Sequence, residues 1–362
     1  MRKSVLVIYA LLTVVIASNA QTDDERRLVF IMMDGMRWQD VFDGADTAYV
    51  NNRKFAVNPK GLSELFVRDT QEERREALMP FLWEMIRDKG LVIGNRWAEC
   101  PMSVENSHWF SYPGYSENLC GCTDDHRITS NDPIDNPNIN VLEVINQTPA
   151  YRGSVMAYAS WGTVDNILNT RRNGIPCVAG YHGRAEEPHL TEQMRFMNTM
   201  KDMMVEEWGD ATRDMFTGMY ALEAMRHLHP KVLYVSLDET DEYGHTGRYD
   251  HYLMAAHADD RIISMLWQQA QSDPFYRDRT TFVIATDHGR GMGDHWTDHG
   301  AITERSGETW LAAFGPGIPH LGEVVGRGPF QNTQIAATIA CLLGVTFQPA
   351  GQEVGPPLFF VE

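Results

Sequence analysis

The tetrapeptide Thr-Asp-His-Gly occurs twice in this chain, at 286–289 and again at 297–300. Aspartate and neutral imidazole are the ligands that divalent zinc or manganese prefers. The glycine behind each histidine lets the backbone turn closely around an ion. Two Asp-His pairs in one short segment therefore indicate a metal site. The alternative is a polar loop in which a short motif repeats by coincidence.

Asp241 and His245 form a second group of candidate ligands, with Gly244 between them. An acid and an imidazole four residues apart on one helical turn can converge on a single ion. The alternative is a solvated acidic loop, because four acids lie within five residues there. A third candidate, Asp34, follows a run of apolar residues, where an isolated aspartate more often caps a helix.

Counted together, the candidates supply enough oxygen and nitrogen ligands for two ions, with room left for water or substrate. The six ligands are Asp34, Asp241, His245, Asp287, His288 and His299. Two substitutes remain open. His295 could replace His299, which we prefer because a glycine follows it. Asp238 could replace Asp241, although it lies seven residues from His245 rather than four.

A metal-dependent hydrolase of this kind also needs a nucleophile. The stretch 102–121 is rich in hydroxyl groups, carried by Ser103, Ser107, Ser111 and Ser116. Serine is a weak nucleophile at neutral pH unless a base or a metal activates it. A Ser-His-Asp triad is not supported, because Gly-Tyr-Ser-Glu-Asn at 114–118 lacks the final glycine of the nucleophile elbow.

The hydrophobic pattern predicts the elements that position these side chains. Three apolar runs end abruptly at acidic or small polar residues, at 28–33, 232–237 and 281–285. Such runs are typical of buried parallel strands, whose carboxyl ends share the edge where open α/β sheets bind ligands. Further strands are predicted at 153–159 and 311–314.

Segments with helical periodicity separate the strands, at 80–89, 191–207, 212–227, 250–269 and 331–343. The alternation predicts an α/β fold, a doubly wound, mostly parallel sheet flanked by helices. The stretches 46–76 and 171–193 do not fit the alternation, and we expect them to be insertions near the active site. We expect a single catalytic domain over 21–362.

Residues 1–20 have the pattern of a secretory signal peptide, with a basic start, a short apolar run and small residues at the end. The run is shorter than the ~20 residues of a spanning helix. We therefore expect cleavage after Ala20, a secreted or periplasmic product, and no membrane span after the signal is removed.

The net charge of −18 over 362 residues argues against binding to a nucleic-acid scaffold. A small phosphorylated substrate remains compatible with this charge if metal ions supply a local positive field. The sequence does not indicate an oligomeric state.

Five cysteines are an odd number for an oxidising compartment, so at least one stays unpaired within the chain. Cys120 and Cys122 are too close for an unstrained bridge to each other. We expect one bridge from this loop to Cys100 or Cys177.

Taken in order, these elements resemble the alkaline phosphatase superfamily, and within it the type I phosphodiesterase/nucleotide pyrophosphatase group. Five elements in the right order, over about 28–343, are far more specific than any one of them. They are Asp34 after the first strand, Ser111-Tyr112-Pro113, Asp241 with His245, Asp287-His288-Gly289, and His299-Gly300.

The resemblance implies a role for each residue. Ser111 would be the nucleophile that forms a covalent phosphoserine, where the group usually has threonine. Asn131 would be the phosphate-binding asparagine. With His299 as the ligand from the second Thr-Asp-His-Gly segment, Asp298 is left to orient an imidazole or the loop. The ions, most simply two Zn²⁺, would be held by two sets of ligands. One set is Asp34, Ser111, Asp287 and His288, and the other is Asp241, His245 and His299.

The chain also departs from the group. The usual Asn-His after the proline is Gly114-Tyr115, and Cys-Gly-Cys at 120–122 replaces a commoner Thr-Gly turn. The substrate therefore stays open between phosphodiesters and phosphomonoesters, with a lean toward diesters because no Arg or Lys can be placed at the site. A sulfatase would need an arginine two residues after Pro113. A non-catalytic metal-binding relative is the remaining alternative.

Overall fold

A central eight-stranded sheet organises residues 26–361, the part of the chain that the structure, a computed structural model, describes. The strand order is β10-β2-β9-β7-β1-β6-β4-β5. In chain order the strands are β1 Arg27–Met33, β2 Gly90–Ile93, β4 Val155–Ala159, β5 Cys177–Ala179, β6 Val232–Leu237, β7 Thr280–Ala285, β9 Leu311–Phe314 and β10 Gly322–Glu323. A separate three-stranded sheet contains β3 Met102–Ser103, β8 Glu308–Thr309 and β11 Phe330–Gln331.

The sheet is parallel at its centre. β1 lies between β6 and β7 and pairs with both in parallel, with Ile31 opposite Val235 on one side and Ile284 on the other. β9 is antiparallel to its neighbours β7 and β2. The expected doubly wound, mostly parallel α/β fold is therefore confirmed.

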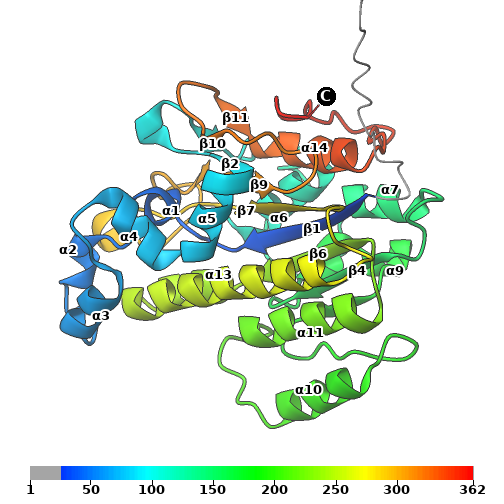
Figure 1. Ribbon diagram of the computed structural model, residues 1–362, viewed down its shortest axis with the longest axis horizontal. Helices are drawn as coiled ribbons and strands as arrows, with labels where there is room; N and C mark the ends of the chain where they lie inside the picture. The colour runs from blue at the N-terminus through cyan, green and yellow to red at the C-terminus, as the bar shows by residue number, and fades with distance from the viewer. Residues whose placement is uncertain (1–25, 362) are drawn as a thin grey trace, which may run out of the picture.

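Helices cover both faces of this sheet (Figure 1). One layer contains α5 Pro80–Lys89, α10 Glu192–Asp202, α11 Asp214–His227 and α13 Tyr249–Ser272. The opposite layer contains α6 Ser111–Cys120, α7 Val141–Gln147, α8 Val164–Leu168 and α14 Ile335–Leu342. The remaining α-helices are α1 Trp38–Asp43, α2 Thr47–Val50, α3 Pro59–Phe66, α4 Gln71–Leu78, α9 Thr170–Asn173 and α12 Glu239–His245.

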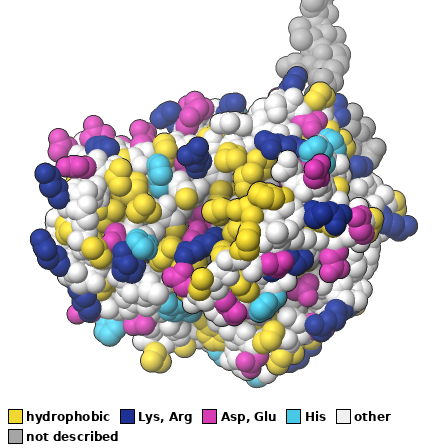
Figure 2. Space-filling model, turned by 90° about the horizontal axis from the view of Figure 1, so that it is seen from below, with side chains coloured by type: hydrophobic (Ala, Val, Ile, Leu, Met, Phe, Trp, Pro, Cys, Tyr) yellow, Lys and Arg dark blue, Asp and Glu magenta, His cyan; other side chains and the backbone are white. Residues whose placement is uncertain are grey.

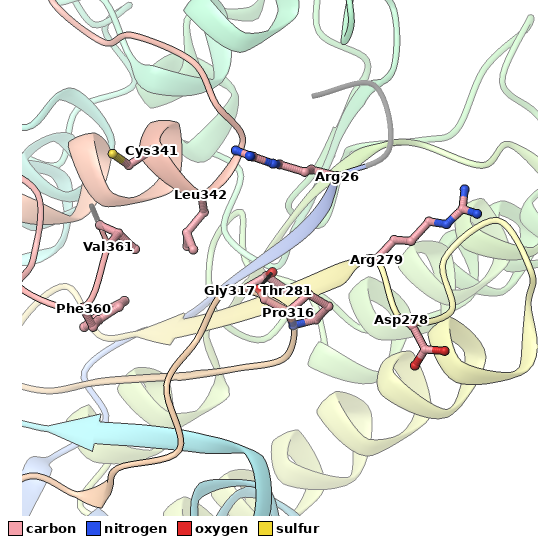
Figure 3. A pocket seen from close by; sticks show the side chains of 10 residues that line it. All are labelled: Arg26, Asp278, Arg279, Thr281, Pro316, Gly317, Cys341, Leu342, Phe360 and Val361. Atoms are coloured by element: carbon pink, nitrogen blue, oxygen red, sulfur yellow. Dashed lines mark hydrogen bonds between the residues drawn. The ribbon is translucent and has the colours of Figure 1, made fainter. Parts of the chain in front are cut away.

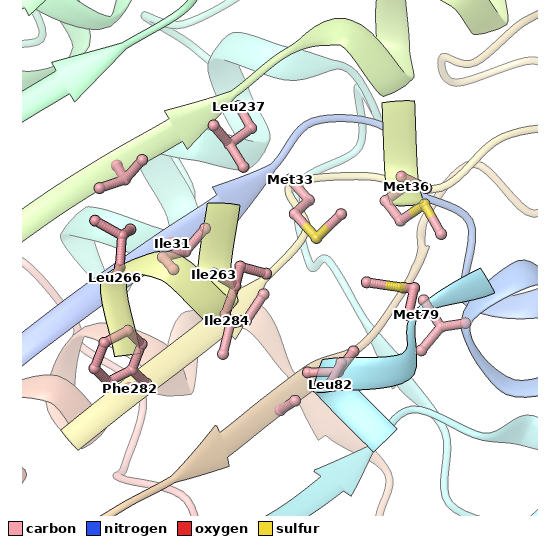
Figure 4. Close-up of a cluster of buried hydrophobic side chains, with 14 of the residues drawn as sticks. Ile31, Met33, Met36, Met79, Leu82, Leu237, Ile263, Leu266, Phe282 and Ile284 are labelled. Atoms are coloured by element: carbon pink, nitrogen blue, oxygen red, sulfur yellow. The ribbon is translucent and has the colours of Figure 1, made fainter. Parts of the chain in front are cut away.

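The hydrophobic core follows the alternation of β1. Ile31 and Met33 belong to the cluster under α13, whereas Phe30 and Met32 belong to the cluster under α6 and α14. Figure 4 shows the α13 side, where Ile31 lies near Ile263. Because successive strand side chains point to opposite faces, one uniformly apolar strand fills both cores.

The strands and helices predicted from hydrophobic pattern are present with boundary shifts of a few residues. β2 was not predicted, because it begins at Gly90, directly after α5. Within the stretch 171–193, three residues form the edge strand β5, which pairs with β4. The stretch 46–76 contains α2 and α3 and the start of α4.

The expected disulfide is absent, because all five cysteines are free. Each sulfur of the 120–122 loop has a polar neighbour of its own. Cys120 Sγ lies 3.7 Å from Asn136 Nδ2, and Cys122 Sγ lies 3.7 Å from Gln352 Nε2. The prediction of a bridge to Cys100 or Cys177 was therefore wrong.

The signal peptide predicted over 1–20 lies outside the described residues. Among residues 26–361, none of the helices combines the length and the hydropathy that crossing a bilayer requires.

Ile31→Ala tests the contribution of the central strand to stability. Ile31 is fully buried, so we expect a loss of about 2–5 kcal/mol in the free energy of unfolding from lost burial and an unfilled cavity. Urea unfolding measures it. Val57→Ala, at a side chain 71% exposed, is the control and should change the free energy by less than about 0.5 kcal/mol. Equal effects of the two substitutions would contradict this account of the core.

Candidate metal centre

The candidate ligands follow three neighbouring strands. Asp34 follows β1, Asp287 and His288 follow β7, and α12, which carries Asp241 and His245, follows β6. Because β1 lies between β6 and β7, their carboxyl ends bring these side chains to one place. Asp34 is not a helix cap, since α1 begins only at Trp38 with Arg37 at its N-cap position.

Asp34, Asp287 and His288 form the first cluster of ligand atoms, and all three are buried. His288 Nε2 lies 3.3 Å from Asp34 Oδ1 and 3.2 Å from Asp287 Oδ2. Ser111 Oγ lies 3.3 Å from the same nitrogen. The serine hydroxyl predicted to be the nucleophile therefore borders the first cluster.

The second cluster of ligand atoms contains Asp241 and His299 together with His288, which the two clusters share. The predicted ligand His245 lies beside this second cluster. Asp241 Oδ2 lies 3.0 Å from His245 Nε2, which lies 2.9 Å from His299 Nε2. The His299 ring also stacks on His288, with ring centroids 4.0 Å apart. Burial and the neighbouring His288 hold the pKa of His299 well below its usual value, so the imidazole is neutral. Neutral imidazole is the form that binds metals.

Two buried carboxylate oxygens in the first cluster, Asp34 Oδ1 and Asp287 Oδ2, accept no hydrogen bond within the described chain. Burial raises the pKa of both carboxyls well above the usual value, and each is raised further by a neighbouring carboxylate. A divalent cation among these oxygens would satisfy them and offset their repulsion. The donor set, carboxylates with imidazoles, fits zinc.

Arg290 is a functional candidate that the sequence analysis missed. It is fully buried and forms an ion pair with Asp241 Oδ1. Burial would raise the pKa of Asp241, but Arg290, His245 and His299 together lower that pKa well below its usual value. The sequence signal was the position of this arginine, directly after an Asp-His-Gly motif at the end of an apolar strand.

The local sequence of α6 explains how Ser111 is positioned. Ser111 is the first residue of the helix, and a Cβ at Gly114 would collide with the carbonyl oxygen of Asp287. The fully buried Tyr115 brings its hydroxyl to 2.8 Å from Ser236 Oγ on β6. The Gly114-Tyr115 departure noted in the sequence thus fits a close packing of α6 against the ends of β6 and β7.

Glu117, which the sequence analysis also missed, holds the loop before the nucleophile. Its carboxylate accepts hydrogen bonds from the backbone N–H groups of Glu105 and Asn106, at 2.8 and 2.9 Å. Asn106 Oδ1 in turn accepts the N–H of Trp109, a non-glycine residue held at φ 55°. Strained conformations of this kind concentrate at functional sites.

The remaining predicted residues have distinct environments. Asn131 lies at the start of α6, where its Oδ1 accepts the N–H of Tyr112 at 2.9 Å. His295 has a side chain 82% exposed, and it belongs to neither ligand cluster. Asp238 is buried but likewise outside both clusters.

Asp298 does not orient an imidazole of the site. Its carboxylate lies 3.9 Å from His295 Nδ1, while His299 Nδ1 has no hydrogen-bond partner in the described chain. Its backbone carbonyl accepts the N–H of Gly291, so it supports the loop through the main chain. Of the two roles predicted for Asp298, the contact with Gly291 matches the support of the loop.

A cavity of about 530 Å³ opens beside the candidate ligand His299. Met292, His295, Ile302 and Arg305 also line it. A cavity of about 560 Å³ lies elsewhere, lined by Arg26, Arg279 and Thr281 near the amino ends of β1 and β7 (Figure 3). A third hollow lies between α11 and α13. Separately, Figure 2 shows one face of the molecule on which apolar side chains gather. Only the first of these three cavities is lined by a candidate ligand.

Glu117 makes stability depend on pH. Burial raises its pKa from 4.5 to about 7, so between these values the folded chain holds a proton that the unfolded chain releases. The stability that this proton contributes is complete below pH 4.5 and is lost as pH rises through 7. We expect Glu117→Gln to flatten this fall by an amount on the order of 1–3 kcal/mol. Urea unfolding of chelator-treated protein at several pH values measures it, and an unchanged slope contradicts it. Glu64→Gln, at an exposed glutamate, is the control.

Comparisons with known proteins place the fold. No family model matches the sequence, and no curated protein matches it. The alkaline phosphatase PafA is 11% identical, with a TM-score of 0.59 over 93% of this chain and 99% of that chain. The 2-O GAG sulfatase BT1596 is 12% identical, with a TM-score of 0.56 over 90% of this chain and 72% of that chain.

The lipoteichoic acid synthase LtaP from Listeria monocytogenes is 10% identical, with a TM-score of 0.56 over 93% of this chain and 75% of that chain. The likeness extends over phosphatase, sulfatase and synthase structures and does not single out the phosphodiesterase/nucleotide pyrophosphatase group. The fold that these proteins share, the alkaline phosphatase-like fold, is the fold of this chain.

Proposed function

We propose that this chain is a hydrolase of phosphoric esters that uses two divalent ions, most simply Zn²⁺, and Ser111 as its nucleophile. The observation that carries the proposal is the convergence of two ligand clusters with one serine hydroxyl, which lies 3.3 Å from His288 Nε2. The two clusters share His288, since one is Asp34, Asp287 and His288 and the other is Asp241, His288 and His299. His245 adjoins the second cluster, 2.9 Å from His299. Export, inferred from residues 1–20, is part of the same proposal.

Each ion would have its own set of ligands. Asp34, Asp287 and His288 would hold the ion beside Ser111, and Asp241, His245 and His299 would hold the other. Bound divalent ions would favour the ionised serine hydroxyl and offset the negative charge of the phosphoryl oxygens. An acidic protein can in this way attract an anionic substrate.

The chain itself positions the phosphoryl group. Ser111 opens the ten-residue helix α6, whose first N–H groups carry partial positive charge and suit an anion. Asn131 Oδ1 is turned toward the N–H of Tyr112 at that helix start. The amide nitrogen of Asn131 is then the donor that we assign to a phosphoryl oxygen.

The reaction that fits this arrangement is a double displacement. Ser111 Oγ attacks phosphorus and forms a phosphoserine, and the alcohol leaves with the proton that the hydroxyl gave up. Water then attacks the phosphoserine, which releases phosphate or a phosphomonoester and restores the serine. The leaving group would occupy the cavity of about 530 Å³ beside His299, which is lined by apolar Met292 and Ile302 and also by charged Glu304 and Arg305.

The preference for diesters remains part of the proposal. Phosphomonoesters carry one more negative charge than phosphodiesters, and an Arg or Lys side chain commonly binds the additional charged oxygen. The arginine at the centre, Arg290, is fully buried and has all three nitrogens engaged by Asp241 and by backbone carbonyls. It is therefore not available to bind a substrate oxygen.

Hydrolysis of sulfate esters is a second candidate function. It is favoured by the structural likeness to the 2-O GAG sulfatase BT1596. It is disfavoured by the residues around Ser111, because Tyr115 stands where the sulfatase motif requires arginine. A binding protein without catalytic activity is the third possibility.

Ser111→Ala tests the nucleophile. We expect turnover of bis(p-nitrophenyl) phosphate to fall by roughly a thousandfold or more, because the covalent step is lost. The metal content, measured by mass spectrometry, should stay near two ions per chain, since all six Asp and His ligands are retained and the recorded contact of Ser111 is to His288. Activity that survives the substitution would exclude the covalent mechanism.

Ester specificity is tested with a matched panel of p-nitrophenyl phosphate, bis(p-nitrophenyl) phosphate and p-nitrophenyl sulfate. We expect hydrolysis of the phosphate esters, fastest for the diester, and loss of activity in a chelator that zinc restores. Turnover of the sulfate alone would support the second candidate. A protein that binds zinc and cleaves none of the three esters would support a binding role.

A further inference from the structure

Arg290 contacts every segment that carries a ligand of the proposed second ion. Its Nη1 donates to Asp241 Oδ1, its Nε donates to the carbonyl of Trp296 at 3.0 Å, and its Nη2 donates to the carbonyl of Thr297 at 2.5 Å. Thr297 lies two residues before His299. One side chain therefore joins α12 to the loop that ends at His299.

Two glycines leave the space for this guanidinium. A Cβ at Gly244 would lie 2.5 Å from Arg290 Cζ. A Cβ at Gly35 would meet the Asp241–Arg290 ion pair, 2.4 Å from Asp241 Oδ1 and 2.9 Å from Arg290 Nη1. All three distances are shorter than real Cβ contacts allow. Gly244 lies directly before His245, and Gly35 directly follows Asp34. The backbone beside two candidate ligands is thus shaped around Arg290.

The carbonyl groups that accept from Arg290 are themselves fixed. Trp296 is fully buried, and its ring packs against Tyr49, Tyr249 and Tyr252 with centroids 5.2 to 5.7 Å apart. This aromatic packing holds the 296–297 backbone in place. The guanidinium therefore has a rigid anchor on one side and the carboxylate of Asp241 on the other.

We propose that Arg290 is the positioning residue of the ion site formed by Asp241, His245 and His299. Arg290 engages Oδ1 of Asp241, the oxygen 3.7 Å from His299 Nε2, and so holds the carboxylate with Oδ2 facing His245, 3.0 Å from that imidazole. By holding the carbonyls of Trp296 and Thr297, it also fixes the loop that presents His299. This inference rests on the proposed two-ion centre.

The planar guanidinium is suited to this role, because its N–H groups point in fixed directions toward several acceptors. Lysine would keep the positive charge but would reach only one or two of the three acceptors. Replacement by glutamine would remove both the positive charge and the planar array of N–H donors. Graded substitution therefore separates the effect of charge from the effect of geometry.

Zinc titration of the full chain against a competing fluorescent chelator tests the proposal. We expect wild type to bind two ions. Arg290→Gln should weaken one of them by roughly 10- to 100-fold, the range for residues that orient metal ligands, and leave the other within about threefold. Arg290→Lys should weaken the same ion by less. His299→Ala identifies the weakened site, because its effect and that of Arg290→Gln should fall on the same ion.

Arg172→Gln is the matched control. Arg172 also donates to one carboxylate, that of Glu143, and to two backbone carbonyls, those of Asn136 and Asn138, yet it belongs to neither ligand cluster. We expect this variant to retain both zinc affinities, whatever its melting temperature.

Three results would overturn the positioning role. They are unchanged zinc affinities in Arg290→Gln, equal weakening of both ions, or the same selective loss in Arg172→Gln. If Arg290→Gln does not fold, Arg290→Lys decides by the same criteria. Wild type that binds fewer than two ions would instead overturn the two-ion centre, and the positioning role with it.

Discussion

The constraint on which this structure depends is the burial of like charges. Asp34, Asp241 and Asp287 lie together at the carboxyl ends of three adjacent strands, within a protein that carries a net charge of −18. Buried carboxylates without compensation cost several kcal/mol each or take up protons. Arg290 compensates the charge of Asp241. Asp34 and Asp287 have no such cation, and one oxygen of each, Asp34 Oδ1 and Asp287 Oδ2, lacks a hydrogen-bond partner in the described chain. A site with this imbalance is suited to bind cations.

The fold brings these groups together through simple means. β1 lies between β6 and β7, so residues far apart in sequence become neighbours where the strands end. α6 packs closely enough, through Gly114, to bring Ser111 to the same edge. Aromatic packing around Trp296 fixes the loop that returns His299 to the centre. The core thereby supports geometry that no exposed loop could maintain alone.

Much of this arrangement could be predicted from the sequence. Apolar runs that stop at Asp34, Asp238 and Asp287 indicate parallel strands, and the strand ends locate the acids. The position of an acid at a strand end does not indicate which side chain it contacts in the fold. Arg290 was missed because an arginine after a motif is usually solvated, and its role arises from backbone carbonyls six and seven residues ahead. The predicted cysteine bridge is absent for a similar reason, since the spacing of cysteines in the sequence does not show which way each side chain points.

Zinc-edge anomalous X-ray diffraction from crystals of the zinc-loaded chain tests the two-ion centre most directly. The account predicts two strong peaks, one among Asp34, Asp287 and His288 and the other among Asp241, His245 and His299. A single peak, no peak at these residues, or a peak at the exposed His295 in place of His299 would contradict it.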